Sequence, residues 1–307
     1  MAENKRIDHP TGTHTVGHEW DGIEELDTPM PRWWVLSFYA CILFAIGYVI
    51  VYPAFPGLHG ASAGLWGWNS RQELKHDMAA ATQARAATVS AIASTPIEQL
   101  PAKKALFDAA VRGGEAAFKV HCVQCHGSGA DGVRPGSGYP NLNDDDWLWG
   151  GDLKSLEYTI TNGIRNPDVA DTRTSQMPAF GKDGILMAAQ VQDVVSYVRT
   201  LSAQDKGNAA SRRGEALFQA NCAVCHGPDG KGGRTVGAPN LTDGIWLYGG
   251  SREAIAQTVT TSRHGVMPAW GHRLDATTIK MLAAYVHSRG GGEADPAPAE
   301  PIAAVTP

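Results

Sequence analysis

Two stretches decide the fold, Cys122-Val-Gln-Cys125-His126 and Cys222-Ala-Val-Cys225-His226. In each stretch two cysteines are separated by two residues and are followed directly by a histidine. With this spacing both thiols can add to the vinyl groups of one haem, and the imidazole can bind the iron on its proximal side. The two motifs therefore predict two covalently bound c-type haems, held by the four cysteines and by His126 and His226.

Other roles for paired cysteines fit this sequence less well. A thioredoxin-type pair needs a βαβ setting, and a four-cysteine zinc site usually brings its pairs within tens of residues. Here 96 residues lie between Cys125 and Cys222, and each pair has its own histidine. The fifth cysteine, Cys41, lies in an apolar run, where we expect a small helix filler rather than a palmitoylation or metal site.

Both motifs belong to an internal repeat. Gly114-Glu-Ala-Ala-Phe118 and Gly214-Glu-Ala-Leu-Phe218 precede them in the same register, 100 residues apart. Further matches follow in the same order: Pro140-Asn-Leu142 with Pro239-Asn-Leu241, Trp147-Leu-Trp-Gly-Gly151 with Trp246-Leu-Tyr-Gly-Gly250, and Met177-Pro-Ala-Phe-Gly181 with Met267-Pro-Ala-Trp-Gly271. The first copy is about ten residues longer before its methionine. Because insertions belong in loops, we place the extra residues in the loop 166 to 175. The soluble part is therefore a tandem duplication.

The repeat also nominates the distal iron ligands. Met177 and Met267 occupy equivalent positions, and the proline after each restricts the backbone to an extended form that can aim a thioether from a loop. We therefore predict His/Met ligation for each haem. The chief alternative is a bis-histidine site that uses one of three other histidines, His121, His264 or His272.

Apolar residues at helical spacing end each copy of the repeat. They are Val191, Val194, Val195, Val198 and Leu201 in the first copy, and Ile279, Leu282, Ala283 and Val286 in the second. We expect Phe118 and Phe218 to pack on Tyr197 and Tyr285 of these terminal helices. A middle helix, capped by Asp152 or Ser251, completes each predicted domain of three or more short helices.

A membrane anchor precedes the repeat. The run from Trp33 to Tyr52 has 20 residues without a charge, and an α-helix of this length spans roughly 30 Å, the thickness of a bilayer's hydrocarbon core. A cleaved signal peptide, with Ala61-Ser62-Ala63 as its cleavage site, is the alternative, but the run is long and follows an acidic region. Basic residues precede the run and none follows before Arg71, so the N-terminus is predicted to be cytoplasmic.

The predicted fold class is all-α, with one N-terminal transmembrane helix followed by two tandem cytochrome c-like haem domains. The expected divisions are a cytoplasmic segment 1–32, a transmembrane helix 33–52, a periplasmic linker with a helical spacer 53–107, cytochrome c domains 108–203 and 208–290, and a disordered tail 291–307.

Composition excludes one function class. The net charge is −5 and no basic stripe is present, which argues against a nucleic-acid partner. Four arginines are candidates to pair with haem propionates: Arg165, Arg173, Arg234 and Arg263. The run Asp144-Asp145-Asp146 is predicted to be a solvated loop, with docking of a basic electron donor as the alternative.

The N-terminal region carries a family resemblance. Trp20-Asp-Gly-Ile-Glu-Glu-Leu-Asp27 and Pro31-Arg-Trp-Trp34, followed by one span and two haem motifs, resemble subunit III of bacterial cbb3-type cytochrome c oxidases. Thr172-Arg-Thr-Ser-Gln-Met-Pro-Ala-Phe-Gly181 and Gly265-Val-Met-Pro-Ala-Trp270 resemble the same family.

The resemblance implies an electron-transfer subunit in the bacterial inner membrane, with its haem domains in the periplasm and no catalytic site of its own. It would accept electrons from a cytochrome c and pass them, through a monohaem cytochrome subunit, to the haem-copper subunit that reduces O₂. Two other functions stay open at this point. One is a dihaem cytochrome that serves another membrane complex, such as a dehydrogenase or nitric oxide reductase. The other is a dihaem peroxidase, which needs an open iron site.

Overall fold

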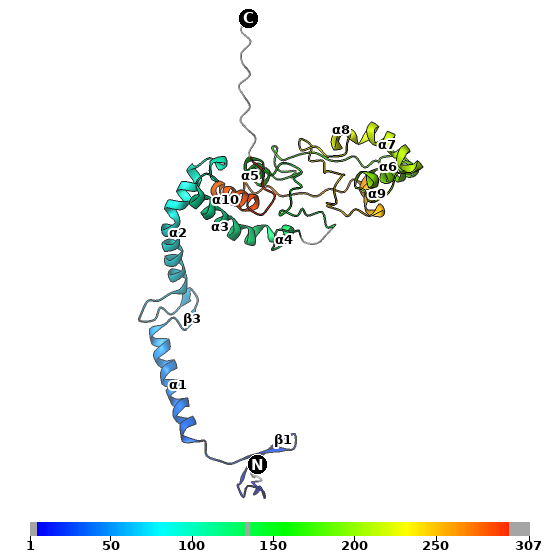
Figure 1. Ribbon diagram of the computed structural model, residues 1–307. Helices are drawn as coiled ribbons and strands as arrows, with labels where there is room; N and C mark the ends of the chain where they lie inside the picture. Colours follow the sequence, from blue (N-terminus) through cyan, green and yellow to red (C-terminus); the bar gives the residue numbers. More distant parts are fainter. Residues whose placement is uncertain (1–4, 133–135, 295–307) are drawn as a thin grey trace. The chain divides into compact units, whose positions relative to one another are not determined.

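Figure 1 shows the computed structural model, which describes residues 5–132 and 136–294. The chain divides into two compact units, one up to Ala84 and one from Arg85 onward. The predicted disordered tail falls mostly on residues 295–307, which lie outside the described residues.

The first unit contains two small hairpins and one long apolar helix. Strands β1 (Thr15–Trp20) and β2 (Ile23–Leu26) form an antiparallel pair closed by Asp21 and Gly22, which both have positive φ. Positive φ at both central residues is the geometry of a tight hairpin turn. A second hairpin joins β3 (Pro56–Gly57) to β4 (Gly60–Ala61). We did not predict either hairpin.

Helix α1 (Arg32–Val51) is the candidate anchor. It is long and apolar enough to cross a membrane, and none of its residues is buried within the protein. Pro31 is the N-cap of the helix and Pro53 follows its C-cap, Tyr52, so a proline lies at each end of the helix. Helix α2 (Ser70–Ser94) then runs across the boundary between the two units, close to the predicted helical spacer.

The second unit is built from helices. After the 3₁₀ turn η1 (Ile97–Gln99), the first repeat supplies α3 (Lys104–His121), α4 (Val123–His126), α5 (Leu153–Asn162) and α6 (Ala188–Leu201). The second repeat supplies α7 (Ala209–Asn221), α8 (Ala223–His226), α9 (Arg252–Thr261) and α10 (Ala276–His287). Asp152 and Ser251 cap α5 and α9, as predicted. The all-α class with one N-terminal apolar helix is confirmed.

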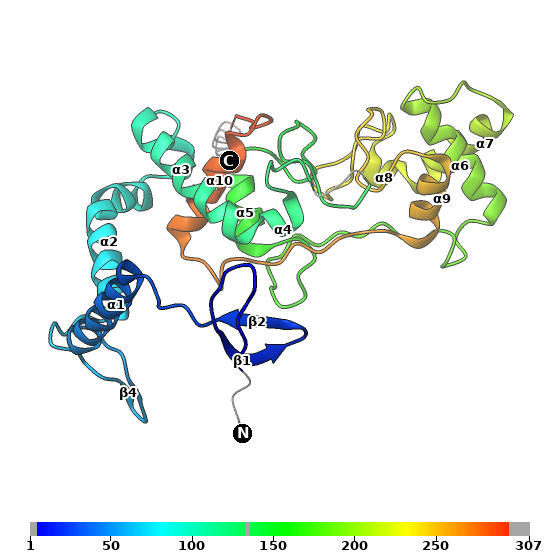
Figure 2. The same cartoon turned by 90° about the horizontal axis from the view of Figure 1, so that it is seen from below.

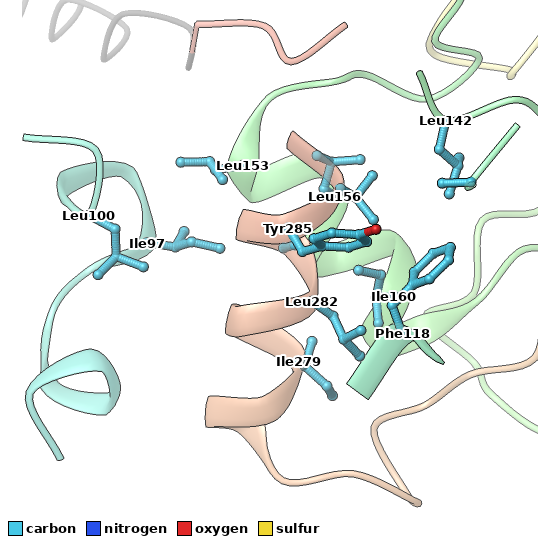
Figure 3. Packing of buried hydrophobic residues seen from close by; sticks show 13 residues of the cluster. Ile97, Leu100, Phe118, Leu142, Leu153, Leu156, Ile160, Ile279, Leu282 and Tyr285 are labelled. Atoms are coloured by element: carbon cyan, nitrogen blue, oxygen red, sulfur yellow. The ribbon is translucent and has the colours of Figure 1, made fainter. Parts of the chain in front are cut away.

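The terminal helices are exchanged between the repeats. Helix α10 of the second repeat packs against α3 and α5 of the first, and α6 of the first packs against α7 and α9 of the second (Figures 1 and 2). Figure 3 shows the first of these cores, where Tyr285 and Leu282 of α10 lie beside Phe118 and Ile160. We expected each terminal helix to pack within its own copy of the repeat, and this pairing is wrong.

Two glycines allow the exchanged helices to approach closely. A Cβ at Gly114 of α3 would lie 2.0 Å from the carbonyl oxygen of Met281 in α10. The equivalent Cβ at Gly214 of α7 would lie 1.9 Å from the carbonyl oxygen of Asp193 in α6. Only glycine fits at both positions, because no real Cβ approaches a carbonyl oxygen so closely.

The linker between the repeats brings α6 and α7 together. Only residues 202–208 separate the two helices, and a short connection between helices usually makes them neighbours. Arg213 of α7 pairs with Asp193 of α6 at 2.6 Å. Arg199 pairs with Asp205 of the linker at 2.7 Å, and Asn208 caps α7. The linker thus holds α6 against the second repeat.

Candidate haem-binding sites

Each Cys-x-x-Cys-His motif forms one helical turn directly after a longer helix. In the first motif the N–H groups of Cys125 and His126 donate to the carbonyl oxygen of Cys122 at 3.1 and 2.9 Å. In the second motif the equivalent groups donate to Cys222 at 3.1 and 3.0 Å. Both motifs therefore hold their thiols and imidazole in the same local arrangement.

The surroundings of His126 and His226 favour the neutral imidazole, with one ring nitrogen free to bind a metal. Nδ1 of His126 lies 3.4 Å from the carbonyl oxygen of Pro140, and Nδ1 of His226 lies 3.1 Å from that of Pro239. A ring N–H on Nδ1 that donates to this carbonyl leaves Nε2 free to bind iron. Burial lowers the pKa of both histidines, which outweighs the opposite effect of the carbonyl contact. Burial thus favours the neutral imidazole, which is the form that binds a metal.

Cys122 and Cys222 differ from the thiols of redox-active cysteines. Burial raises the pKa of Cys122 and of Cys222 to about 11, whereas redox-active cysteines have lowered values. All five cysteines of the chain are free of disulfide bonds. Within residues 5–132 and 136–294, no three His, Cys, Asp or Glu side chains are grouped to hold a metal ion. Cys122 is partly buried and Cys222 is buried, both beside apolar side chains, which suits the edge of a porphyrin.

The exchange of helices also exchanges the two methionines. Met267 packs against the core that contains Phe118 and Leu142 of the first repeat. Met177 packs against the core that contains Phe218 and Cys222 of the second. Each Cys-x-x-Cys-His motif is therefore accompanied by the methionine of the other copy.

Backbone contacts hold each Met-Pro loop on the opposite repeat. Met267 and Ile164 exchange two N–H···O bonds of 3.0 Å each, directly after α5. Ser262, at the end of α9, donates its hydroxyl to the carbonyl oxygen of Met177. A few residues after each methionine, the N–H of Gly271 donates to the carbonyl oxygen of Thr161 at 3.0 Å, and the N–H of Lys182 donates to that of Thr260 at 2.9 Å.

The bis-histidine candidates are placed less favourably. The ring of His121 lies 5.4 Å from that of Trp270, which it contacts as an aromatic partner. His272 is exposed. His264 is also exposed, and its Nδ1 lies 2.7 Å from the carbonyl oxygen of Ser262, although it lines a surface pocket together with Met177.

Two of the four arginine candidates lie in equivalent places. Arg173 and Arg263 each precede a candidate ligand methionine by four residues. The guanidinium carbon of Arg173 lies 5.3 Å from the ring centroid of Trp149, and Nε of Arg173 donates to the hydroxyl of Thr159 at 2.8 Å. Arg263 stacks on Tyr248 at 4.9 Å and makes the same contact with Thr258 at 2.9 Å. These two arginines are the better candidates to pair with propionates.

The other two arginines do not lie in equivalent places of the repeat, and they bind other groups of the protein. Arg234 pairs with Glu293, which also accepts from the N–H of Gly151 at 2.8 Å. Glu293 belongs to the predicted disordered tail, so the first residues of that segment are ordered by these contacts. Arg165 donates to the carbonyl oxygens of Gly265 at 2.7 Å and Ser175 at 2.9 Å.

Two buried indole N–H groups indicate whether haem fits these sites. Trp149 Nε1 and Trp246 Nε1 are buried and lack a hydrogen-bond partner among the described residues. Buried donors are normally satisfied, so these groups indicate an acceptor that the polypeptide does not supply. Haem propionates are such acceptors, and the sites therefore fit the group. Sequence reasoning did not identify either nitrogen, because only the folded chain shows which indoles lack a partner.

The two sites contact one another through a reciprocal pair of contacts. Tyr248 lies over Gly138, where a Cβ would come within 2.5 Å of the ring. The equivalent Trp149 lies over Gly237, where the distance would be 2.2 Å. The N–H of Gly138 also donates to the carbonyl oxygen of Leu247 at 2.8 Å. An aromatic ring of each repeat thus covers a glycine that follows the haem motif of the other.

Comparisons with known proteins identify the family. Residues 12–59 match the model for the N-terminal domain of cytochrome oxidase-cbb3, FixP. Residues 109–198 and 209–286 match the model for cytochrome c oxidase, cbb3-type, subunit III. The chain belongs to the cbb3-type cytochrome c oxidase subunit III family. Its cytochrome c domains bind haem c, and its role is electron transfer within an oxidoreductase complex.

Characterised relatives match nearly the whole chain. The cbb3-type cytochrome c oxidase subunit CcoP of Cereibacter sphaeroides is 51% identical over 91% of this chain and 95% of its own length. Subunit FixP of Rhizobium meliloti is 49% identical over 95% of this chain and all of its own length. Together with α1, these matches make the chain a membrane-anchored member of the subunit III family.

Proposed function

We propose that the chain carries two haems, each held by residues of both repeats. Cys122, Cys125 and His126 would hold the first haem, with Met267 as its distal ligand. Cys222, Cys225 and His226 would hold the second, with Met177 as its distal ligand. The observation that carries this assignment is the position of Met267 in the first core and of Met177 in the second.

The chemistry of these residues suits electron transfer rather than oxygen chemistry. Haem supplies a reversible one-electron Fe(III)/Fe(II) couple, and a methionine ligand raises its reduction potential. A methionine thioether bound to the iron would also keep O₂ and peroxide from it. Apolar side chains packed around Met177 and Met267 would limit the access of water to the iron, and His126 and His226, whose pKa values are lowered by burial, would bind it as neutral imidazoles.

The proposed path runs from a cytochrome c donor through the two haems to the oxidase. The reciprocal contacts of Tyr248 with Gly138 and of Trp149 with Gly237 support direct transfer between the two sites, because they bring the surrounding loops into contact. The partners would be the monohaem cytochrome subunit and the haem-copper subunit that reduces O₂. The basic residues before α1 support a cytoplasmic N-terminus and periplasmic haem domains in the bacterial inner membrane.

The ligand assignment can be tested by marking one haem. In Cys122→Ser the first haem has a single thioether bond, so its visible spectrum differs from that of the second haem. Met267→Ala in this background should open the marked haem to CO, and the CO difference spectrum should carry the marked haem's features. Met177→Ala in the same background is the matched control, and it should open the unmarked haem.

Each result has a clear meaning. Each single methionine variant should lose about half of the near-infrared methionine-to-iron band, because one methionine serves each haem. The opposite pattern, with CO on the marked haem only in the Met177 variant, would refute the crossed assignment. Unchanged near-infrared bands in both variants would refute methionine ligation and favour a bis-histidine site.

A further inference from the structure

The chain folds back onto the end of α1 as soon as that helix stops. The N–H groups of Leu65 and Trp66 donate to the carbonyl oxygens of Ile50 at 2.9 Å and Val51 at 3.2 Å. Carbonyls in the last turn of a helix otherwise lack partners, which is costly near hydrocarbon. We name residues 52–69 the collar, because this segment closes the end of the apolar helix.

The collar has a defined internal structure. The hydroxyl of Ser62 accepts from the N–H groups of Ala54 and Phe55, both at 3.1 Å. The N–H of Ser62 donates back to the carbonyl oxygen of Phe55 at 2.8 Å. These bonds hold the base of the β3–β4 hairpin, whose turn carries Leu58 at 99% exposure.

Aromatic rings join the collar to α1. Tyr52 stacks on Tyr48 of the helix at 4.7 Å. Trp66 and Trp68 meet the ring of Tyr52 edge-on, at 5.1 and 5.7 Å. Trp66 nevertheless keeps 67% of its surface exposed. Tyrosine and tryptophan concentrate where a membrane meets water, since their rings are apolar and their polar atoms can face the headgroups.

The collar is apolar at its surface and carries no acidic or basic side chain apart from His59. From Trp33 to Ser70 the sequence has no Asp, Glu, Lys or Arg, and the first such residue is Arg71 of α2. The uncharged run is therefore much longer than the span itself. Phe55, Leu58 and Leu65 are 63, 99 and 78% exposed. Large apolar side chains exposed together in one short segment favour a lipid or protein contact.

We propose that the collar lies in the interfacial layer of the membrane that α1 crosses, with Phe55 and Leu58 among the lipid chains. Lipid is the expected contact because the collar continues the apolar surface of α1. It is hydrogen-bonded to the last turn of that helix and is uncharged up to the start of α2. The collar would then fix the depth of the helix end. This proposal rests on α1 as the membrane anchor and is independent of the haem ligands.

Spin labelling of the complete oxidase in lipid nanodiscs of phosphatidylcholine and phosphatidylglycerol tests this proposal. A nitroxide is placed at Leu58→Cys in a Cys41→Ser background, and its exposure to O₂, which concentrates in lipid, is compared with exposure to a water-soluble nickel chelate. The ratio of the two should be severalfold higher than for a label at Met78→Cys in α2, an exposed residue of the same unit. In a separate sample that keeps the native Cys41, a label on this residue gives the ratio expected in the interior of the span.

Two outcomes would overturn the proposal. A label at Leu58→Cys that the nickel chelate reaches as readily as it reaches Met78→Cys would place the collar in water. A label shielded from both reagents would mean that another oxidase subunit covers the collar. Phe55→Cys repeats the measurement at a second site, and an unchanged haem content in each variant shows that the chain is assembled.

Discussion

The ring of Phe118 packs against that of Tyr285 with centroids 5.2 Å apart, although the two residues belong to different copies of the repeat. Phe218 and Tyr197 form the equivalent contact, also at 5.2 Å. Each of the two cores is therefore accompanied by the Cys-x-x-Cys-His motif of one copy and contains the terminal helix of the other. Neither copy alone contains a complete core, and this dependence has measurable consequences.

Cleavage of the linker should leave the two repeats associated. A protease site placed between Ala203 and Asn208 would cut the chain between α6 and α7. Because each core contains helices from both fragments, we expect the fragments to co-elute in native size-exclusion chromatography and to retain the near-infrared methionine band. Separation into two folded monohaem domains would contradict the exchanged packing.

A chain that stops after Ala203 is the complementary case. It keeps the first haem motif but lacks α10 and Met267, so its haem should lose the near-infrared band and become accessible to CO. If the first copy formed its own domain, the shortened chain would instead give a low-spin His/Met haem. The full-length chain, purified in the same way, is the control.

The close approach of α3 and α10 predicts that a substitution of Gly114 destabilises the protein. Alanine there would place Cβ against the carbonyl oxygen of Met281, a backbone atom that cannot move alone, so Gly114→Ala should lower the free energy of unfolding by about 1 to 3 kcal/mol. Gly113→Ala is the matched control on the same helix. Its Cβ would meet the flexible end of the Met281 side chain, and the gain in helix propensity of about 1 kcal/mol offsets the contact. Thermal unfolding of the haem-loaded variants measures both, and equal losses would refute this distinction.

Much of this architecture could be predicted from the sequence. The haem motifs, the apolar span and the caps Asp152 and Ser251 depend on local patterns, which is why they could be identified before the fold was known. The exchange of α6 and α10 could not be identified from apolar patterns, because the two copies present the same apolar residues at equivalent positions. Phe118 is equally suited to Tyr197 or Tyr285. The informative signal was the short linker 202–208, which favours α6 and α7 as neighbours.

Long-range pairing also explains what was missed around the acidic run. Asp144, Asp145 and Asp146 were predicted to form a solvated loop, yet Asp146 is half-buried. The fold brings Asp243, the repeat equivalent of Asp144, close enough to act on Asp146 electrostatically. Sequence alone could not indicate this proximity, because it arises from the contact between the two haem sites.

Stability should depend on the ionisation of Asp146. Burial, and secondarily the charge of Asp243, raise its pKa from the ordinary 3.8 to about 6. Between these values the folded protein holds a proton that the unfolded chain has released, so the free energy of unfolding falls as the pH rises through this window. Asp146→Asn should remove this fall and stabilise the protein at neutral pH by no more than about 1 kcal/mol, since the carboxyl group is partly exposed to solvent. Thermal unfolding below and above the pKa tests this, and Asp145→Asn, which removes only one of the smaller charge effects on Asp146, should change the fall much less. An unchanged pH profile in Asp146→Asn would contradict the prediction.

Lys280 of α10 should hold the end of α2 in place. Its ammonium group donates to the carbonyl oxygens of Ile92 at 3.3 Å, Ala93 at 3.0 Å and Thr95 at 2.8 Å. These carbonyls lie at the C-terminus of α2, where a cation is favoured by the helix dipole. Lys280→Met keeps the aliphatic stem and removes the charge, so it should cost about 1 to 2 kcal/mol and speed amide exchange in the last turn of α2.

The matched control for Lys280 is a lysine whose charge contacts only solvent-exposed partners. Lys104 pairs with Asp108 one turn away on the surface of α3, and such pairs contribute no more than about 0.5 kcal/mol. Lys104→Met should therefore leave both the unfolding temperature and the exchange rates of residues 91–95 nearly unchanged. Hydrogen exchange read by mass spectrometry separates the two variants. Equal protection of residues 91–95 in Lys280→Met and in the unmodified chain would show that the apolar contact of Ile92 with Ala110 and Ala284 holds this end of α2 without the lysine.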